Sequence, residues 1–205
     1  MTKSIFGITL LLGALASLPA DARRGGGRDD SRNDRGGSAP GRVDLVRGTQ
    51  NWFLQESAEH LLRDEEATNA TRAQTLSQVQ VSLLSPAQTQ VDLSFADAGP
   101  RQALCNMIDE SSRGGSVLKK DVRCEGAPDR SGRDRPRGTR ADQLGEAIEH
   151  SLRAERAARA VDFVKASAQY NEAATAIAVE LLSVTNERVG YLCQVRGGSS
   201  VSCRK

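Results

Sequence analysis

The chain has 205 residues and carries 28 Lys and Arg against 26 Asp and Glu, so its formal net charge is only +2. Aromatic residues make up 3% of the sequence. Nucleic-acid-binding proteins usually combine a basic surface with aromatic side chains. The composition therefore argues against nucleic-acid binding and favours one folded domain with appendages.

Residues 1–22 have the pattern of an export signal. Lys3 supplies a positive charge, residues 5–18 are mostly apolar, and small residues lead up to Ala22, after which a signal peptidase is predicted to cleave. The alternative is an uncleaved anchor, but the apolar stretch is short, and no later segment has the roughly 18 uninterrupted apolar residues of a membrane helix. We therefore expect a secreted or periplasmic protein with no integral membrane segment after cleavage.

Two segments are rich in Arg, Gly and Asp. Residues 23–42 contain no large apolar residue, and residues 125–140 repeat this composition inside the chain. Such segments bury too little apolar surface to offset their ordering entropy, so we expect a disordered tail and a flexible loop. They are either simply solvated or a means of binding an anionic envelope polymer.

Periodicity predicts a helix followed by a β-hairpin. Leu54, Ala58, Leu61 and Leu62 fall on one face of a helix over residues 50–66. From residue 76 to residue 95 apolar and polar residues alternate on both sides of a turn at Pro86. This alternation is typical of two antiparallel strands that bury one face.

Residues 141–189 read as helical because no Gly or Pro interrupts the sequence between residues 145 and 190. The prediction is one long helix, either continuous or bent near residues 169–171 into a helical hairpin. A coiled coil is a minor alternative, since charged residues interrupt the heptad seam. The expected partner-binding face comprises Leu144, Ile148, Leu152, Ile177, Leu181 and Val184.

The four cysteines are expected to form two structural disulfides. If Cys105 faces Cys124 in a hairpin, Met107 faces Val122 and two acidic residues face two lysines. Placing Cys193 opposite Cys203 likewise sets Val195 against Val201. Both local pairings therefore give sensible hairpins.

No catalytic or metal-binding motif is complete. His60 and His150 are the only histidines, and neither has the spacing of a zinc or two-iron site. No nucleophile elbow or phosphate-binding loop is present. We therefore expect no enzyme activity, no cofactor and no metal. The alternative is a small secreted hydrolase that uses helix carboxylates such as Glu146 and Glu149.

The sequence thus predicts an α+β domain over residues 43–205. It would contain a short helix, an antiparallel meander of about four strands, a long C-terminal helix and a terminal hairpin. The expected function is that of an exported, disulfide-stabilised interaction or structural protein. Its partner, or a second copy, would bind through the long helix.

Overall fold

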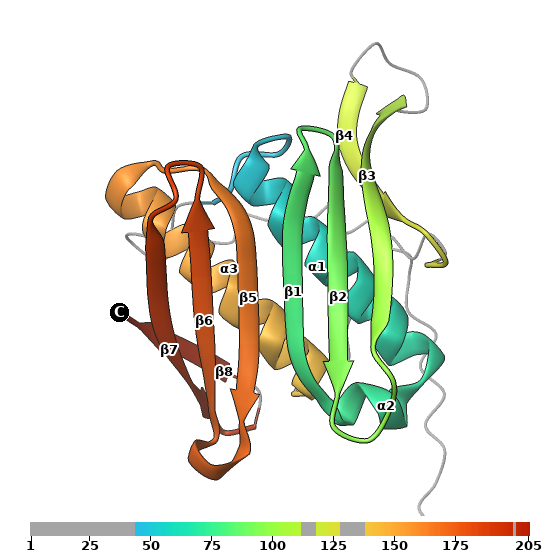
Figure 1. Cartoon of the computed structure of the whole chain (residues 1–205), viewed down its shortest axis with the longest axis vertical. Coiled ribbons are helices and arrows are strands. Elements are labelled where there is room, and N and C mark those ends of the chain that lie inside the picture. Colours follow the sequence, from blue (N-terminus) through green and yellow to red (C-terminus); the bar gives the residue numbers. More distant parts are fainter. Residues whose placement is uncertain (1–43, 112–117, 128–137, 199) are drawn as a thin grey trace, which may run out of the picture. The chain divides into compact units, whose positions relative to one another are not determined.

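An eight-stranded antiparallel sheet forms the centre of the structure, a computed structural model (Figure 1). The structure describes residues 44–111, 118–127, 138–198 and 200–205. The predicted signal peptide and Arg-rich tail, and residues 128–137 of the predicted loop, lie outside these ranges. The strands are β1 (Leu76–Ser85), β2 (Gln88–Phe95), β3 (Arg101–Ser111), β4 (Leu118–Cys124), β5 (Phe163–Asn171), β6 (Ala176–Ser183), β7 (Arg188–Arg196) and β8 (Ser200–Arg204).

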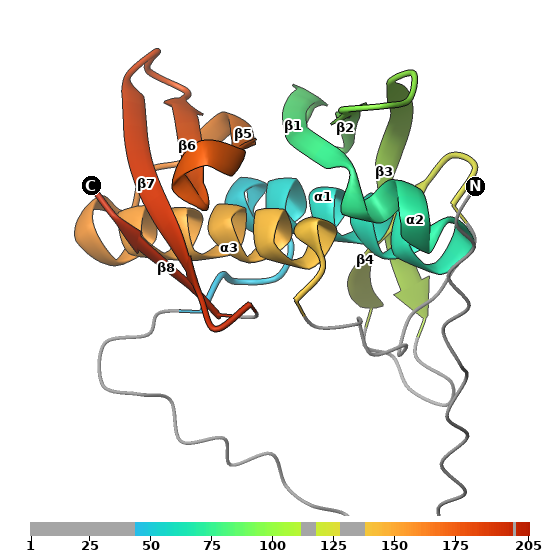
Figure 2. The same ribbon diagram turned by 90° about the horizontal axis from the view of Figure 1, so that it is seen from below.

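Two helices cover one face of the sheet. Helices α1 (Gln50–Thr68) and α3 (Arg140–Arg159) lie side by side beneath the central strands (Figure 2). The short helix α2 (Ala70–Gln74) follows α1, and a 3₁₀ turn, η1 (Glu172–Ala174), follows β5. The edge strands β4 and β8 curl toward the helices and contact them. The apolar core therefore lies between the helix pair and the sheet.

The strand order, β4-β3-β2-β1-β5-β6-β7-β8, divides the domain into two similar halves. Each half is a helix followed by a four-stranded meander, and a disulfide joins the third and fourth strands of each meander. The first strands of the two meanders, β1 and β5, pair antiparallel at the centre. The halves are therefore related by an approximate twofold axis through the β1–β5 pair.

The same duplication is present in the sequence around the helices. Residues 47–67 and 137–157 share identical residues at matching positions, namely Arg47, Gly48, Thr49, Leu54, Glu56, Glu59, His60, Leu62, Arg63, Glu65 and Ala67 in the first copy. Thr49 and Thr139 both accept a backbone N–H as helix N-caps. Gly48 and Gly138, which precede them, both have φ of 85°, a conformation that suits glycine.

Several sequence predictions are confirmed. The first helix and the hairpin of β1 and β2 lie where the periodicity placed them. The register of β3 and β4 sets Cys105 opposite Cys124, and both predicted disulfides are formed. Lys120 also lies opposite Asp109, and their side chains form an ion pair of 2.7 Å. Cysteine spacing, with charge pairing in the first hairpin and the facing Val195 and Val201 in the second, was therefore sufficient to predict both disulfide hairpins.

The predicted long C-terminal helix is wrong, and the sheet has eight strands where the prediction placed a meander of about four and a separate terminal hairpin. The helix ends at Arg159, Ala160 follows in the left-handed conformation, and the chain then forms β5 and β6. In β5, the buried Ala166 and Ala168 alternate with partly or fully exposed polar residues. Alanine favours helices locally, but here its small side chain lets the sheet pack closely on α3, and this tertiary contact overrides the preference.

Candidate functional site

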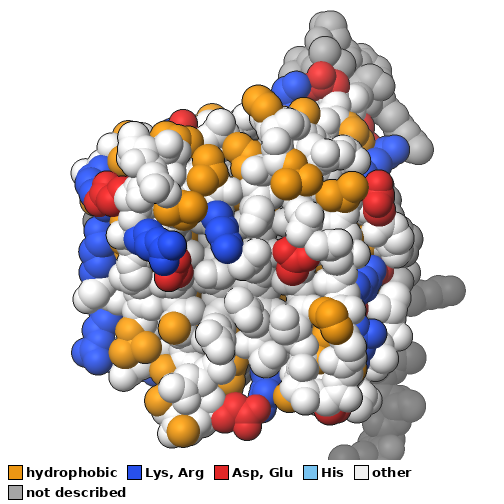
Figure 3. Space-filling view, viewed as in Figure 1, with side chains coloured by type: hydrophobic (Ala, Val, Ile, Leu, Met, Phe, Trp, Pro, Cys, Tyr) orange, Lys and Arg blue, Asp and Glu red, His pale blue; other side chains and the backbone are white. Residues whose placement is uncertain are grey.

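None of the helices in the described part of the chain covers the second face of the sheet. Inward residues such as Val79, Val81 and Ala168 are buried against the helices, whereas the residues between them point away. We call this outward side of β3, β2, β1, β5, β6 and β7 the open face. Uncharged polar and backbone surface fills most of its centre, with hydrophobic side chains in separate groups around it (Figure 3).

One row of outward residues crosses six strands. The pairing registers give its order as Gln102, Asp92, Gln80, Ser167, Glu180 and Gly190. The approximate twofold axis passes between Gln80 and Ser167, so Asp92 corresponds to Glu180 and Gln102 corresponds to Gly190. Along this row the two halves are thus matched in charge, except that a glutamine side chain in one is missing in the other.

Gly190 lies within a hollow of about 450 Å³ on the open face. The hollow is lined by Gln78, Gln169, Ala178, Glu180, Gly190 and Leu192, among others. Apart from Gly190 itself and its two neighbours in the chain, no heavy atom lies within 4 Å of the position that a Cβ on Gly190 would occupy, and the φ of Gly190 is not positive. Neither backbone conformation nor packing within the described residues therefore requires glycine here.

Basic residues dominate the outward positions of the second half. Lys165 in β5, Arg188 and Arg196 in β7 and Arg204 in β8 alternate with inward residues, against the single acidic residue Glu180. Arg188 contacts Glu180 at 3.5 Å. Arg188 and Leu192 flank Gly190 along β7, so the hollow lies beside both a cation and an apolar side chain.

The carboxylates proposed for a hydrolase lie on α3, away from this hollow. Glu149 forms an ion pair of 2.7 Å with Arg153, and neither Glu146 nor Glu149 lines the hollow. The equivalent Glu56 and Glu59 on α1 contact Arg63. Burial, reinforced by the charge of Glu59, raises the pKa of Glu56. No group of three His, Cys, Asp or Glu side chains in the described part of the chain could hold a metal ion.

A duplicated glutamate anchors each helix to its own meander. Glu65 on α1 accepts a hydrogen bond of 2.7 Å from Arg101 at the start of β3, and Glu155 on α3 accepts one of 2.5 Å from Tyr191 of β7. Lys205 also lies 2.5 Å from Glu155. Burial would raise the pKa of Glu155, but hydrogen bonds from Lys205, Tyr191 and Arg159 together outweigh it and leave this pKa lowered.

Glu155→Gln should therefore destabilise the protein in a pH-dependent manner. Because the folded-state pKa of Glu155 is lowered, its contribution is complete above the ordinary glutamate pKa and disappears as the pH falls through the folded value. We expect a loss of about 2 kcal/mol in the free energy of unfolding at pH 7, shrinking at pH 3, in urea titrations. Glu187→Gln, at the half-exposed partner of Arg159, is the control and should have little effect. An equal loss at both pH values would contradict this role.

The residues of the predicted partner-binding face are split between two elements. Leu144, Ile148 and Leu152 lie on α3 and are fully buried in the core. Ile177 and Leu181 lie on β6 and are equally buried, whereas Val184 follows β6 and is 55% exposed. They form no helical surface, because half of the predicted helix is a strand.

The open face was missed because the second half was assigned as helix. The available signals were the repeated Arg-Gly-Thr and Glu-His motifs and the alternation of Ile177, Val179 and Leu181 with more exposed residues.

The two disulfides are compatible with an oxidising extracellular environment. Among the described helices, none has the length and apolar character needed to cross a membrane. No family model matches this chain, and no curated protein or solved structure matches it significantly.

Proposed function

We propose that the chain is an exported, disulfide-stabilised binding protein without catalytic activity, which binds an acidic surface of a protein partner through the open face. The observation that carries the proposal is an eight-stranded sheet whose described helices all lie on one side. Antiparallel sheets can leave one face in water. The side chains on that face therefore indicate whether it is simply solvated or binds a partner.

The size of the open face suits a protein interface. Six strands spaced about 4.8 Å apart, with about eight residues each at 3.3 Å per residue, cover roughly 24 by 26 Å. The projected area is about 600 Å², and the true surface is larger because side chains protrude. This is close to the roughly 800 Å² that each partner contributes to a standard interface.

The side chains favour protein over other polymers. Outward residues on these strands include Gln78, Gln80 and Gln90, whose amides can both donate and accept hydrogen bonds. No aromatic side chain occupies an outward position on the described strands; Tyr170, for example, lies against Arg140 of α3. Stacking of bases, which single-stranded nucleic acids require, therefore has no platform here. The cations of the second half favour an acidic partner surface.

Hydroxyl-radical footprinting tests this proposal through exposed aliphatic side chains. Leu192 on the open face is 42% exposed, and Val46, outside the sheet, is 54% exposed. In the extracytoplasmic fraction of the native host, the partner should protect Leu192 at least threefold relative to the purified protein, with Val46 unchanged. Equal oxidation of Leu192 in both samples, or protection confined to Val46, would contradict the proposal.

A further inference from the structure

We infer that the hollow at Gly190 is the specificity pocket of the open face, and that it receives an apolar side chain from an acidic segment of the protein partner. This inference rests on the proposed function, because it names the part of the partner that enters the open face. It is carried by the glycine itself, by the lining of the hollow and by the charges beside it.

A glycine in the middle of β7 has a cost without a local benefit. Glycine inside a strand loses more backbone entropy than other residues and contributes no side chain to the sheet. Its usual justifications are a positive φ or a close neighbour, and Gly190 has neither within the described structure. The remaining justification is that something from outside the chain approaches the backbone at this point.

The internal duplication supplies a comparison within the same molecule. Gln102 occupies the equivalent place in the first half, where its amide donates a hydrogen bond of 2.7 Å to Asp92. In the second half the equivalent acid, Glu180, has no such neighbour, because Gly190 has no side chain to offer. The missing side chain at position 190 therefore places this hollow mainly in the second half, away from the centre of the open face.

The lining selects the occupant. Ala178 and Leu192 give the hollow apolar contacts, and its polar and charged lining residues include Gln78, Gln169, Glu180 and Lys205. An apolar side chain can contact Ala178 and Leu192 there, while the amides can hydrogen-bond to the peptide groups around it. Arg188 and Arg204 lie close by on β7 and β8, with Arg204 paired opposite Leu192, so carboxylates next to the apolar anchor would find cationic partners.

Substitutions at Gly190 can fill the hollow without straining the backbone. Gly190→Trp places a large side chain in the hollow, and Gly190→Gln restores the side chain that the first half has. Gln102→Trp is the matched control, because it adds the same bulk at the equivalent position of the other half. Unchanged far-ultraviolet circular dichroism and the absence of free thiols would show that each variant is folded.

The probe is a phage-displayed library of random dodecapeptides, selected on the disulfide-intact wild-type protein. The enriched peptides should carry Asp or Glu next to a large apolar residue. They should bind Gly190→Trp at least tenfold more weakly than wild type, bind Gly190→Gln with an intermediate affinity, and bind Gln102→Trp unchanged.

Four outcomes would overturn the inference. These are a library that yields no enriched peptide, enrichment of basic peptides, equal binding to wild type and Gly190→Trp, and a wild-type dimer in solution that Gly190→Trp dissociates. The last result would assign the hollow to a second copy of the chain. Footprinting in the extracytoplasmic fraction tests the proposed function separately. Protection of Leu192 there would still support binding of a partner to the open face, even if no peptide bound at the hollow.

Discussion

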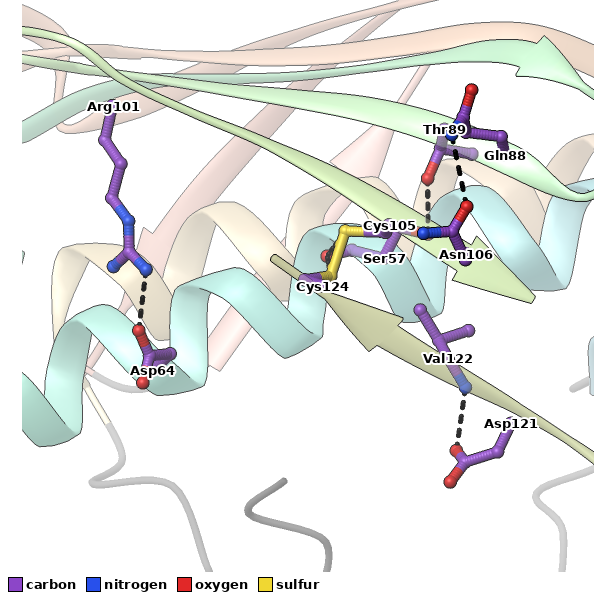
Figure 4. The surroundings of a disulfide bond; sticks show 10 residues. All are labelled: Ser57, Asp64, Gln88, Thr89, Arg101, Cys105, Asn106, Asp121, Val122 and Cys124. Atoms are coloured by element: carbon purple, nitrogen blue, oxygen red, sulfur yellow. Dashed lines mark hydrogen bonds and ion pairs between the residues drawn. A yellow bond between two sulfur atoms is a disulfide. The ribbon is translucent and has the colours of Figure 1, made fainter. Parts of the chain in front are cut away.

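Arg101→Leu is expected to lower the free energy of unfolding by about 3 kcal/mol. The Arg101 guanidinium lies 2.8 Å from Asp64 and 2.7 Å from Glu65, and both carboxylates are almost fully buried on α1 (Figure 4 shows the contact with Asp64). Removing the cation leaves two buried negative charges with less compensation, and breaking buried pairs typically costs 3–5 kcal/mol. The lower end applies here because Arg72 stays 3.1 Å from Glu65.

Urea unfolding at pH 7 measures this loss. The control is Arg123→Leu, which removes an exposed cation from the outward side of β4, and surface substitutions of this kind usually change stability by less than about 0.5 kcal/mol. Equal losses for the two variants would show that Arg101 is not an anchor between α1 and β3.

Removing either disulfide should cost about 3 kcal/mol. The cysteines are 19 residues apart in Cys105–Cys124 and 10 apart in Cys193–Cys203, and chain-entropy estimates give slightly more for the longer loop. The first bond also lies in the core above Ser57 of α1, where the Ser57 hydroxyl accepts a hydrogen bond from Thr89 of β2 (Figure 4). Replacing both pairs by alanine would remove about 6 kcal/mol, which is comparable to the whole stability of many domains.

The paired variants Cys105→Ala/Cys124→Ala and Cys193→Ala/Cys203→Ala, and their combination, can be compared by thermal unfolding. We expect each pair to retain the fold with a lower Tm, and the combination to be largely unfolded at 37 °C. A combined variant that unfolds within a few degrees of the wild type would show that packing alone maintains the domain.

Local signals in the sequence were sufficient for the first half and for both disulfide hairpins. Alternation around Pro86 fixed β1 and β2, and the charge pairs opposite each other fixed the register of β3 and β4. These predictions succeeded because the interacting residues are close in the sequence, so that pairing and burial could be read from one short segment.

The second half could not be assigned from local preference. Ala166, Ala168 and Ala176 favour a helix in isolation, and they become strand residues because small side chains fit between the sheet and α3. That contact is long-range and leaves no local signature. The duplication offered an indirect signal of the second meander. Residues 137–157 repeat the start of the first half, and a repeated helix predicts a repeated meander after it.

The candidate site was hidden for a related reason. Gly190 reads as the end of a helix when residues 141–189 are taken as helical, whereas in the structure it is a strand residue that faces the open side of the sheet. Its meaning depends on its equivalence to Gln102, which only the strand registers establish.

Site-specific photo-crosslinking in the native host tests the central claim most directly, because it reports which side of the domain meets a partner. A photoreactive residue would replace Gln80 at the centre of the open face or, as the control, the exposed Ala154 on α3. The account predicts a discrete protein adduct from position 80 and none from position 154. An adduct that forms from position 154 alone would place the partner on the helices and contradict the account.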